Sequence, residues 1–194
     1  MNAIALPPVG SLLDADLYVG RILIAGRPFA ILLPPKAIAE HAATIWIARG
    51  KSVPEALSWN DGLANTEAMA RAGSRLAQWA LDLRFYIPSV DELELAYRAL
   101  KPTAETNTVW GRSGVNASAD PPTHPYTADL PQQTALEAYR AGGTEAFEPE
   151  AHWTSTQHAS DSSLAWSQYF INGYQYDWSK GVKLRARAVR RLPL

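Results

Sequence analysis

The chain has 194 residues, with 18 basic and 19 acidic side chains, a formal net charge of -1, seven tryptophans and no cysteine. A net charge near zero gives no long-range attraction to nucleic acid or to an anionic membrane surface, so we expect neither as a partner. The lack of cysteine excludes disulfides, thiolate metal ligands and thiol nucleophiles.

We expect residues 1–194 to form a single domain around one core, with residues 1–16 as an N-terminal lead-in. The first ten residues have no basic segment followed by an apolar run, which predicts synthesis in the bacterial cytoplasm without a signal peptide. Arg27, Pro34 and Pro35 interrupt the longest apolar stretches, so we expect no membrane insertion.

Strand-type sequence comes first along the chain. Leu17–Ile24 and Phe29–Leu33 flank a short turn containing Gly26, which predicts a β-hairpin. Thr44–Ala48 is rich in β-branched and aromatic residues and predicts a further short strand.

The middle of the chain has helical spacing. Between Pro54 and Leu83 apolar residues recur at helical intervals, with breaks expected at Gly62 and Gly73, so we predict two or three short helices.

The clearest single helix follows Ser89, which has the spacing of a capping box with Glu92 and is expected to end at Pro102. One face of this helix carries the apolar residues Leu93, Tyr97 and Leu100. Asp91, Glu92 and Glu94 lie in its first turn, where we interpret them as offsetting the helix dipole and not as a catalytic pair.

The last third of the chain begins with a predicted loop over residues 103–131, where Gly, Pro, Asn and Ser follow no period. Gln133–Gly143 predicts a short helix closed by two glycines. In the segment 152–194, Leu164–Phe170 alternates as a strand, Asn172-Gly173 predicts a two-residue turn, and residues 174–178 and 182–189 predict further strands. We therefore predict a C-terminal meander.

The segment from His152 to Lys180 has an unusual composition, with three tryptophans, three tyrosines and six serines but two acids and one lysine. Large aromatic side chains are mostly buried, so we expect Trp153, Trp166 and Phe170 to belong to the core. Strand periodicity and turn positions point the remaining side chains outward, in a mixture typical of a binding surface. The predicted ligand-binding residues are His158, Ser160, Ser163, Ser167, Tyr169, Asn172, Tyr174, Tyr176, Asp177 and Trp178.

The sequence "HWTSTQHASDSSLAWSQYF" with "LRARAVRR" resembles the C-terminal signature of C-type-lectin-like domains that are common in phages and prophages and related in fold to formylglycine-generating enzyme. "SWNDGLANTEAMA", "PSVDELELAYRALKPT" and "RAGGTEAFEP" resemble the same branch, so the similarity runs from about Gly20 onward. The resemblance implies an α+β, C-type-lectin-like fold with short helices packed on small antiparallel sheets and long irregular loops. Relatives usually carry a short Gly/Asp/Trp segment before the "PS" helix, whereas here "LDLR" runs directly into Phe85.

The resemblance and the composition together predict a non-enzymatic recognition module in the tail of a phage virion. Its partner would be a bacterial surface glycan or protein, and other virion proteins or further copies of the chain are additional candidates. Some relatives are variable proteins of diversity-generating retroelements, so a narrower hypothesis makes the C-terminal segment the target of that mutagenesis. The alternatives are a structural virion or assembly protein and an enzyme of the same fold, although copper-dependent oxidation lacks its thiolate ligands here.

No cofactor or metal is predicted. Asn60-Asp61 and Glu148-Pro149-Glu150 resemble calcium-lectin motifs in reversed order, and we prefer a helix-start role for Asn60-Asp61. The spacing of His152, His158 and Asp161 matches no standard ligand motif.

Two further patterns have an ordinary interpretation. The run from Lys180 to Arg191 has six basic residues and no acid, which we interpret as an exposed strand face and not as a nucleic-acid site. Asn116 begins a formal glycosylation sequon, to which we assign no role.

Overall fold

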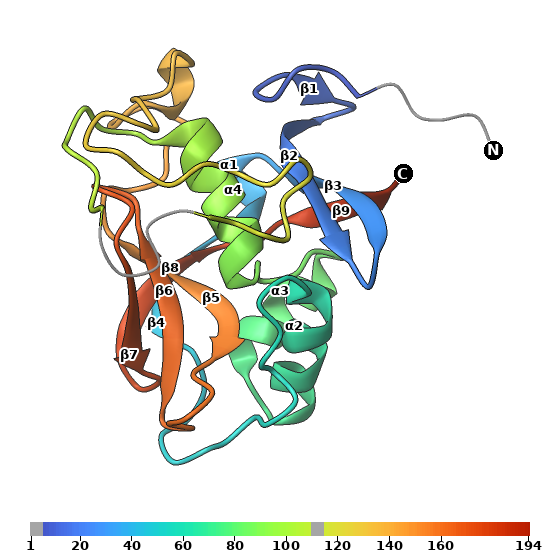
Figure 1. Ribbon diagram of the computed structural model, residues 1–194. Coiled ribbons are helices and arrows are strands. Elements are labelled where there is room, and N and C mark those ends of the chain that lie inside the picture. Colours follow the sequence, from blue (N-terminus) through green and yellow to red (C-terminus); the bar gives the residue numbers. More distant parts are fainter. Residues whose placement is uncertain (1–5, 110–114) are drawn as a thin grey trace.

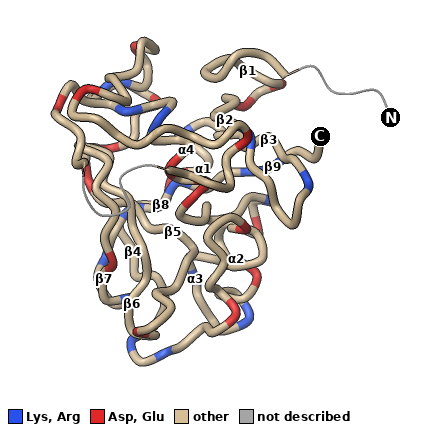
Figure 2. Tube along the Cα trace, viewed as in Figure 1, with Lys and Arg blue, Asp and Glu red and all other residues tan. Residues whose placement is uncertain are grey.

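The computed structural model describes residues 6–109 and 115–194 and has a mixed α+β fold with two β-sheets (Figure 1). The α+β class predicted from the sequence is confirmed. Basic and acidic residues are interspersed along the chain and do not gather on one element (Figure 2). This mixing agrees with the near-zero net charge.

The first sheet has four strands in the order β1-β2-β3-β9. Its strands are β1 (Leu12–Leu13), β2 (Asp16–Ile24), β3 (Arg27–Leu33) and β9 (Arg190–Pro193). The predicted β2–β3 hairpin is confirmed, and both turn residues, Ala25 and Gly26, have positive φ angles of 50° and 75° as a tight two-residue turn requires. The part of the chain expected to be a lead-in already joins this sheet through β1.

The second sheet has five strands in the order β4-β8-β5-β6-β7. Its strands are β4 (Glu40–Ile45), β5 (Ala151–Gln157), β6 (Leu164–Tyr169), β7 (Gln175–Ser179) and β8 (Lys183–Arg187). The predicted meander is correct for β6 and β7 but wrong for β8, which leaves β7 and inserts between β4 and β5, parallel to β5. Because β8 lies inside the sheet, Ala186 of β8 and Ala188 just after it are completely buried.

The helices are α1 (Lys36–Ala39), α2 (Gly62–Arg71), α3 (Arg75–Asp82), α4 (Val90–Leu100) and the 3-10 helix η1 (Glu137–Tyr139). Gly62 and Gly73 lie at helix boundaries, as predicted. Two predictions are wrong in extent: the strand expected at Thr44–Ala48 lies earlier, because Trp46 and Ile47 turn into the core, and Gln133–Gly143 forms a single 3-10 turn.

Helix α4 confirms the most specific sequence prediction. Ser89 is its N-cap and makes a reciprocal capping box with Glu92. The three residues of the predicted apolar face, Leu93, Tyr97 and Leu100, are fully buried. The acidic residues near its start, Asp91, Glu92 and Glu94, are also buried, which agrees with their interpretation as structural residues.

The carboxylate of Glu92 joins three parts of the chain. Its Oε2 atom accepts hydrogen bonds from the backbone of Gly62 at 3.0 Å and from the backbone and hydroxyl of Ser89 at 2.8 and 2.9 Å. Its Oε1 atom accepts one from the Tyr86 hydroxyl at 2.8 Å. Burial raises the pKa of Glu92 to about 7, and the hydrogen bonds from Ser89 and Tyr86 oppose that rise. One side chain thus fixes the starts of α2 and α4 against each other.

Two main hydrophobic clusters surround this junction. The first packs α4 against β2 and β3 and includes Phe147 and Phe170. The second packs α2 and α3 against the five-stranded sheet and includes Trp46 and Trp153. The β6–β7 hairpin extends from both clusters, since Phe170 belongs to the first and Ala165 to the second.

Gly62→Ala should destabilise the protein by about 3 kcal/mol, because an added Cβ would lie 2.2 Å from Glu92 Oε2 and 2.6 Å from the Ser89 nitrogen. Chemical denaturation measures the change. Gly181→Ala is the matched control, because no atom lies within 4 Å of its added Cβ. Equal unfolding midpoints for the two variants would contradict the role of the junction.

His152 should make stability depend on pH. Its ring is fully buried among Phe147 and Phe170, and burial, followed by the charges of Arg185 and Arg187, lowers the pKa of His152 to about 3. Because the unfolded residue binds a proton near pH 6.5 and the folded residue does not, stability is full above about pH 6.5 and falls as the pH decreases toward 3.

His152→Phe should remove this part of the slope, which approaches about 1.4 kcal/mol per pH unit. Denaturation curves recorded between pH 4 and 7 give the free energy of unfolding of each protein as a function of pH. The prediction concerns the slope of that function, so a loss of stability that is the same at every pH does not affect the test. Parallel curves for the two proteins would show that His152 titrates normally in the fold.

Candidate functional site: an aromatic row on the β6–β7 hairpin

The β6–β7 hairpin forms one edge of the five-stranded sheet, with β7 outermost (Figure 1). Ala165 pairs with Trp178 and Ser167 with Tyr176, which puts these residues on one face of the hairpin. The paired strands therefore aim the large side chains of β7 to the same side as Tyr169.

Four aromatic side chains lie in sequence along this face, and we call them the aromatic row. The ring centroids of Tyr169 and Tyr174 are 6.3 Å apart, those of Tyr174 and Tyr176 are 5.6 Å apart and nearly parallel, and those of Tyr176 and Trp178 are 5.8 Å apart and edge to face. These separations lie in the favourable range for aromatic pairs. Tyr176 has 44% of its surface exposed, and the other three are half-buried.

The turn that precedes β7 differs from the predicted two-residue turn. Four residues connect Tyr169 to Tyr174, whose backbones are joined by a hydrogen bond of 2.8 Å. Phe170 causes the difference, because its ring leaves the turn to stack on Phe147 at 3.8 Å. Asn172 stays half-buried, and its side-chain oxygen accepts a hydrogen bond from the Tyr174 backbone.

Ser167 is not exposed, although its strand position predicted an outward side chain. Ser167 is only 1% exposed, and its hydroxyl donates to the Tyr176 carbonyl at 2.9 Å. Its cross-strand partners are Trp153 and Tyr176, and two large aromatic neighbours cover a small side chain between them. Strand alternation correctly places Ser167 on the same face of the hairpin as Tyr169, but it does not show that neighbouring aromatic residues cover Ser167.

The other predicted residues separate into two groups. Asp177 lies on the opposite face of the hairpin from the aromatic row, where it pairs across the strands with Trp166, a predicted core residue. Ser160 and Ser163 are exposed in the β5–β6 loop, where Ser163 donates to Asp161. The ten residues do not form one continuous site.

Trp166 also departs from its prediction as a core residue. It is half-buried, with its ring 5.2 Å from Trp59 and 5.4 Å from His158. Trp153 and Phe170, the other two predicted core aromatics, are fully buried as expected.

A pocket of about 420 Å³ adjoins the aromatic row at its first and last members, Tyr169 and Trp178. Its lining includes the predicted binding residues Tyr169 and Trp178, together with Glu150 and Arg185. Ala43, Ala151, Ile171 and Leu184, which the sequence did not single out, complete the apolar part. Partial burial raises the pKa of the Tyr169 hydroxyl, which therefore remains protonated at neutral pH. The site can present aromatic surface together with hydrogen-bond donors.

The charges at this pocket are largely balanced. Arg185 approaches Glu150 at 3.3 Å and Glu40 at 3.2 Å. These pairs hold the guanidinium against the sheet, so it forms part of a fixed wall. The sequence alone does not show that β8 lies between β4 and β5. With that position known, strand alternation would have predicted that Arg185 lies in this wall.

The basic run is not the exposed strand face that was predicted. Arg187 has no exposed surface and pairs with Glu145 at 3.1 Å and Glu40 at 3.4 Å. Lys180 is buried over the Trp46 ring, and burial lowers the pKa of Lys180 to about 8. Acids from distant segments neutralise Arg187, whereas the Lys180 ammonium donates to the Gln157 side-chain oxygen and to the Lys51 carbonyl.

The two residues that end the basic run also pair with distant acids. Arg190 forms an ion pair with Asp16, and Arg191 forms one with Asp61 at 2.8 Å. Positive charge concentrated in the sequence is thus distributed over several ion pairs in the fold.

The calcium-lectin-like residues have structural roles. Asp61 is the N-cap of α2 and accepts a hydrogen bond from the Ala64 backbone, which confirms the helix-start interpretation. Asn60 donates to the Leu23 carbonyl, and Glu148 pairs with Lys36 at 2.8 Å. Within residues 6–109 and 115–194, no group of three or more His, Cys, Asp or Glu residues could hold a metal ion.

The sequon asparagine is a buried connector. Asn116 is 2% exposed, and its amide donates to the Asp91 carbonyl at 2.8 Å and to the Glu94 carboxylate at 3.0 Å. These bonds attach the long loop to α4.

Comparison of the chain with protein-family models, with curated proteins and with solved structures found no match. None of the helices in the described part of the chain is long and apolar enough to cross a membrane.

Arg187→Met should destabilise the protein by about 3 kcal/mol, since it leaves the Glu40 and Glu145 carboxylates without their buried partner. Lys183→Met on the same strand is the control, because its side chain is exposed and should change stability by less than about 0.5 kcal/mol. Thermal and chemical unfolding measure both variants. A small effect at Arg187 would restore the interpretation of the basic run as a surface feature.

Proposed function

We propose that the protein is a non-enzymatic recognition module of phage or prophage origin, with a C-type-lectin-like fold, that binds a bacterial surface ligand through the aromatic row. The observation that carries the proposal is the row itself: Tyr174, Tyr176 and Trp178 follow one another along an edge strand with their rings in contact and partly exposed. Rigid aromatic side chains provide binding area at low entropic cost.

The surroundings of the row support the proposal. The pocket beside Tyr169 and Trp178 offers a mostly apolar surface, and of its charged residues Arg185 and Glu150 are paired with each other. Concave, mostly apolar sites with a few polar groups are typical of ligand-binding sites. The Thr154 hydroxyl of β5 donates to the Trp166 carbonyl at 2.9 Å and attaches the hairpin to a buried strand, so a ligand would meet a prearranged surface.

The ligand would be a glycan or a protein on the host cell, and the protein would act in the virion tail. The retroelement hypothesis is narrower and concerns the same surface. It predicts substitutions at exposed row positions such as Tyr176, and it predicts none at buried Ser167.

Replacing Tyr174 and Tyr176 with alanine should lower binding to host cells at least tenfold, because buried aromatic contacts of this kind each contribute about 1–2 kcal/mol or more to an interface. Trp178 is left in place because it packs against the second hydrophobic cluster. Circular dichroism and unfolding verify that the variant folds, and Leu130→Ala, an exposed apolar residue outside the hairpin, is the control.

The measurement is adsorption of labelled protein to intact bacteria from the phage's host range. Periodate treatment of the cells removes a glycan ligand, and protease treatment removes a protein ligand, so the two cases are separated. Undiminished adsorption of the folded double variant would refute the proposed site. Self-association through the hairpin, without adsorption, would favour a structural role in the virion.

A further inference from the structure

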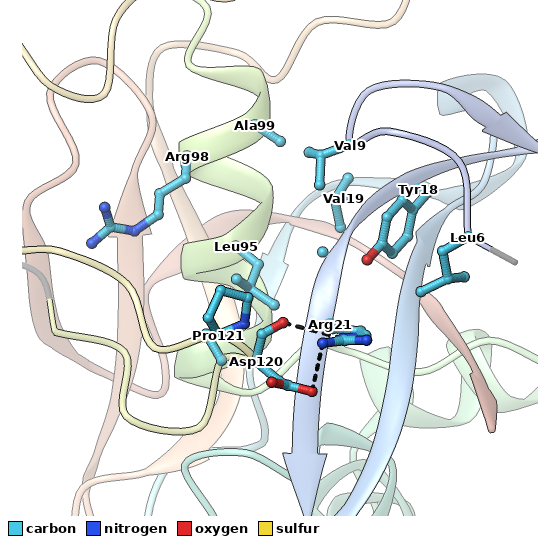
Figure 3. Close-up of a pocket in the computed structure, with 12 residues that line it drawn as sticks. Leu6, Val9, Tyr18, Val19, Arg21, Leu95, Arg98, Ala99, Asp120 and Pro121 are labelled. Atoms are coloured by element: carbon cyan, nitrogen blue, oxygen red, sulfur yellow. Dashed lines mark hydrogen bonds and ion pairs between the residues drawn. The ribbon is translucent and has the colours of Figure 1, made fainter. Parts of the chain in front are cut away.

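A second pocket, of about 400 Å³, lies between the N-terminal segment, β2 and α4 (Figure 3). Leu6 and Val9 form one wall, and Leu95 and Ala99 of α4 form the opposite wall. The remaining lining comes from Tyr18–Arg21 of β2 and from residues 119–121 of the long loop. It shares no lining residue with the pocket beside the aromatic row.

Backbone contacts fix the walls of this pocket. The Gly10 nitrogen donates to the Tyr18 carbonyl at 2.8 Å, and the Tyr18 nitrogen donates to the Ser11 carbonyl at 2.9 Å. On the other side, the Asp120 nitrogen donates to the Arg21 carbonyl at 3.0 Å. The N-terminal segment and the loop are therefore both anchored to β2.

Gly20 lets β2 approach α4 at the base of the pocket. Its φ angle is 150°, at an irregularity in the pairing with β3, and an added Cβ would lie 3.2 Å from a Leu95 methyl group. The pocket floor is thus formed where backbone and helix meet closely.

The Tyr18 hydroxyl is a hydrogen-bonding group in the lining of the pocket. Tyr18 is 5% exposed, and its hydroxyl points into the pocket (Figure 3). Among residues 6–109 and 115–194 no side chain or backbone group is hydrogen-bonded to this hydroxyl, and it is not among the fully enclosed unpaired atoms, so a ligand in the pocket can reach it. Burial raises the pKa of Tyr18, so the hydroxyl keeps its proton and can donate.

The cations at the pocket are already neutralised. The Arg21 guanidinium binds Asp120 through a side-chain contact of 2.9 Å and donates to its carbonyl at 3.2 Å (Figure 3). Arg98 pairs with Glu94, and its guanidinium points away from the pocket. An anionic ligand would have to compete with these carboxylates.

From this geometry we propose that the pocket binds a small uncharged molecule with an apolar body and one oxygen acceptor, which receives the hydrogen bond of the Tyr18 hydroxyl. The apolar body contacts Val19, Leu95 and Ala99. The size suits a ligand at the small end of those that pockets of 300–1,000 Å³ accommodate.

The test uses prodan, an uncharged naphthalene ketone whose fluorescence shifts to shorter wavelength in apolar surroundings. We expect saturable binding to the full chain. Tyr18→Phe should weaken the binding about 5- to 10-fold through the lost hydrogen bond. Tyr139→Phe, a half-buried tyrosine outside the pocket, should leave it unchanged.

A filled pocket and a charged competitor complete the experiment. Ala99→Phe should abolish binding, and Ala99→Leu replaces it if the larger side chain prevents folding. Unlabelled 2-acetylnaphthalene should displace prodan, and 2-naphthoate should displace it at least tenfold less well. The proposal is overturned by an absence of saturable binding, by equal binding to the wild type and the Tyr18 and Ala99 variants, or by stronger displacement with the anion.

Discussion

The buried carboxylate of Glu92 is the interaction on which the arrangement of the helices depends. It accepts hydrogen bonds from Gly62, Ser89 and Tyr86, and so joins the start of α2, the start of α4 and the segment that bridges to Val189 ahead of β9. An unsatisfied carboxylate in this position would be very costly, whereas one surrounded by four donors is stable and specifies a single geometry. The requirement for glycine at position 62 follows from the same crowding.

The candidate site depends on this scaffold through β5. Every residue of β5 is buried, and its polar side chains serve as internal connectors: Thr156 donates to the Ser58 carbonyl, and Gln157 accepts from the Val53 backbone and from Lys180. The β6–β7 hairpin therefore pairs with a strand that is held firmly on all sides. Trp153 and Phe170 already fill the core beside the hairpin. The aromatic row can therefore remain partly exposed.

Local signals in the sequence were sufficient for α4, the β2–β3 hairpin and the helix boundaries at Gly62 and Gly73, because caps, turns and glycines act over a few residues. The path of β8 could not be predicted, because the partners of Arg187 are Glu40 and Glu145, far away along the chain. The same limit affected the site. Alternation along one strand placed Ser167 and Tyr169 on one face, but the residues of neighbouring strands determine which of the two a ligand can reach. The pocket residues Ala43, Ile171 and Leu184 belong to no motif, and only the folded sheet shows that they lie together.

The strand order has a consequence for how the chain folds. Strand β8 fills the space between β4 and β5, and β9 pairs with β3, so both sheets remain incomplete until strands made late in synthesis arrive. Pairings between such distant segments slow folding, because a long loop must close before any contact is gained. A nascent chain that has produced β2 to β6 would expose unpaired strand edges at β3 and β5. Exposed strand edges of this kind can pair with other chains, so the incomplete sheets are the stage of folding most open to aggregation.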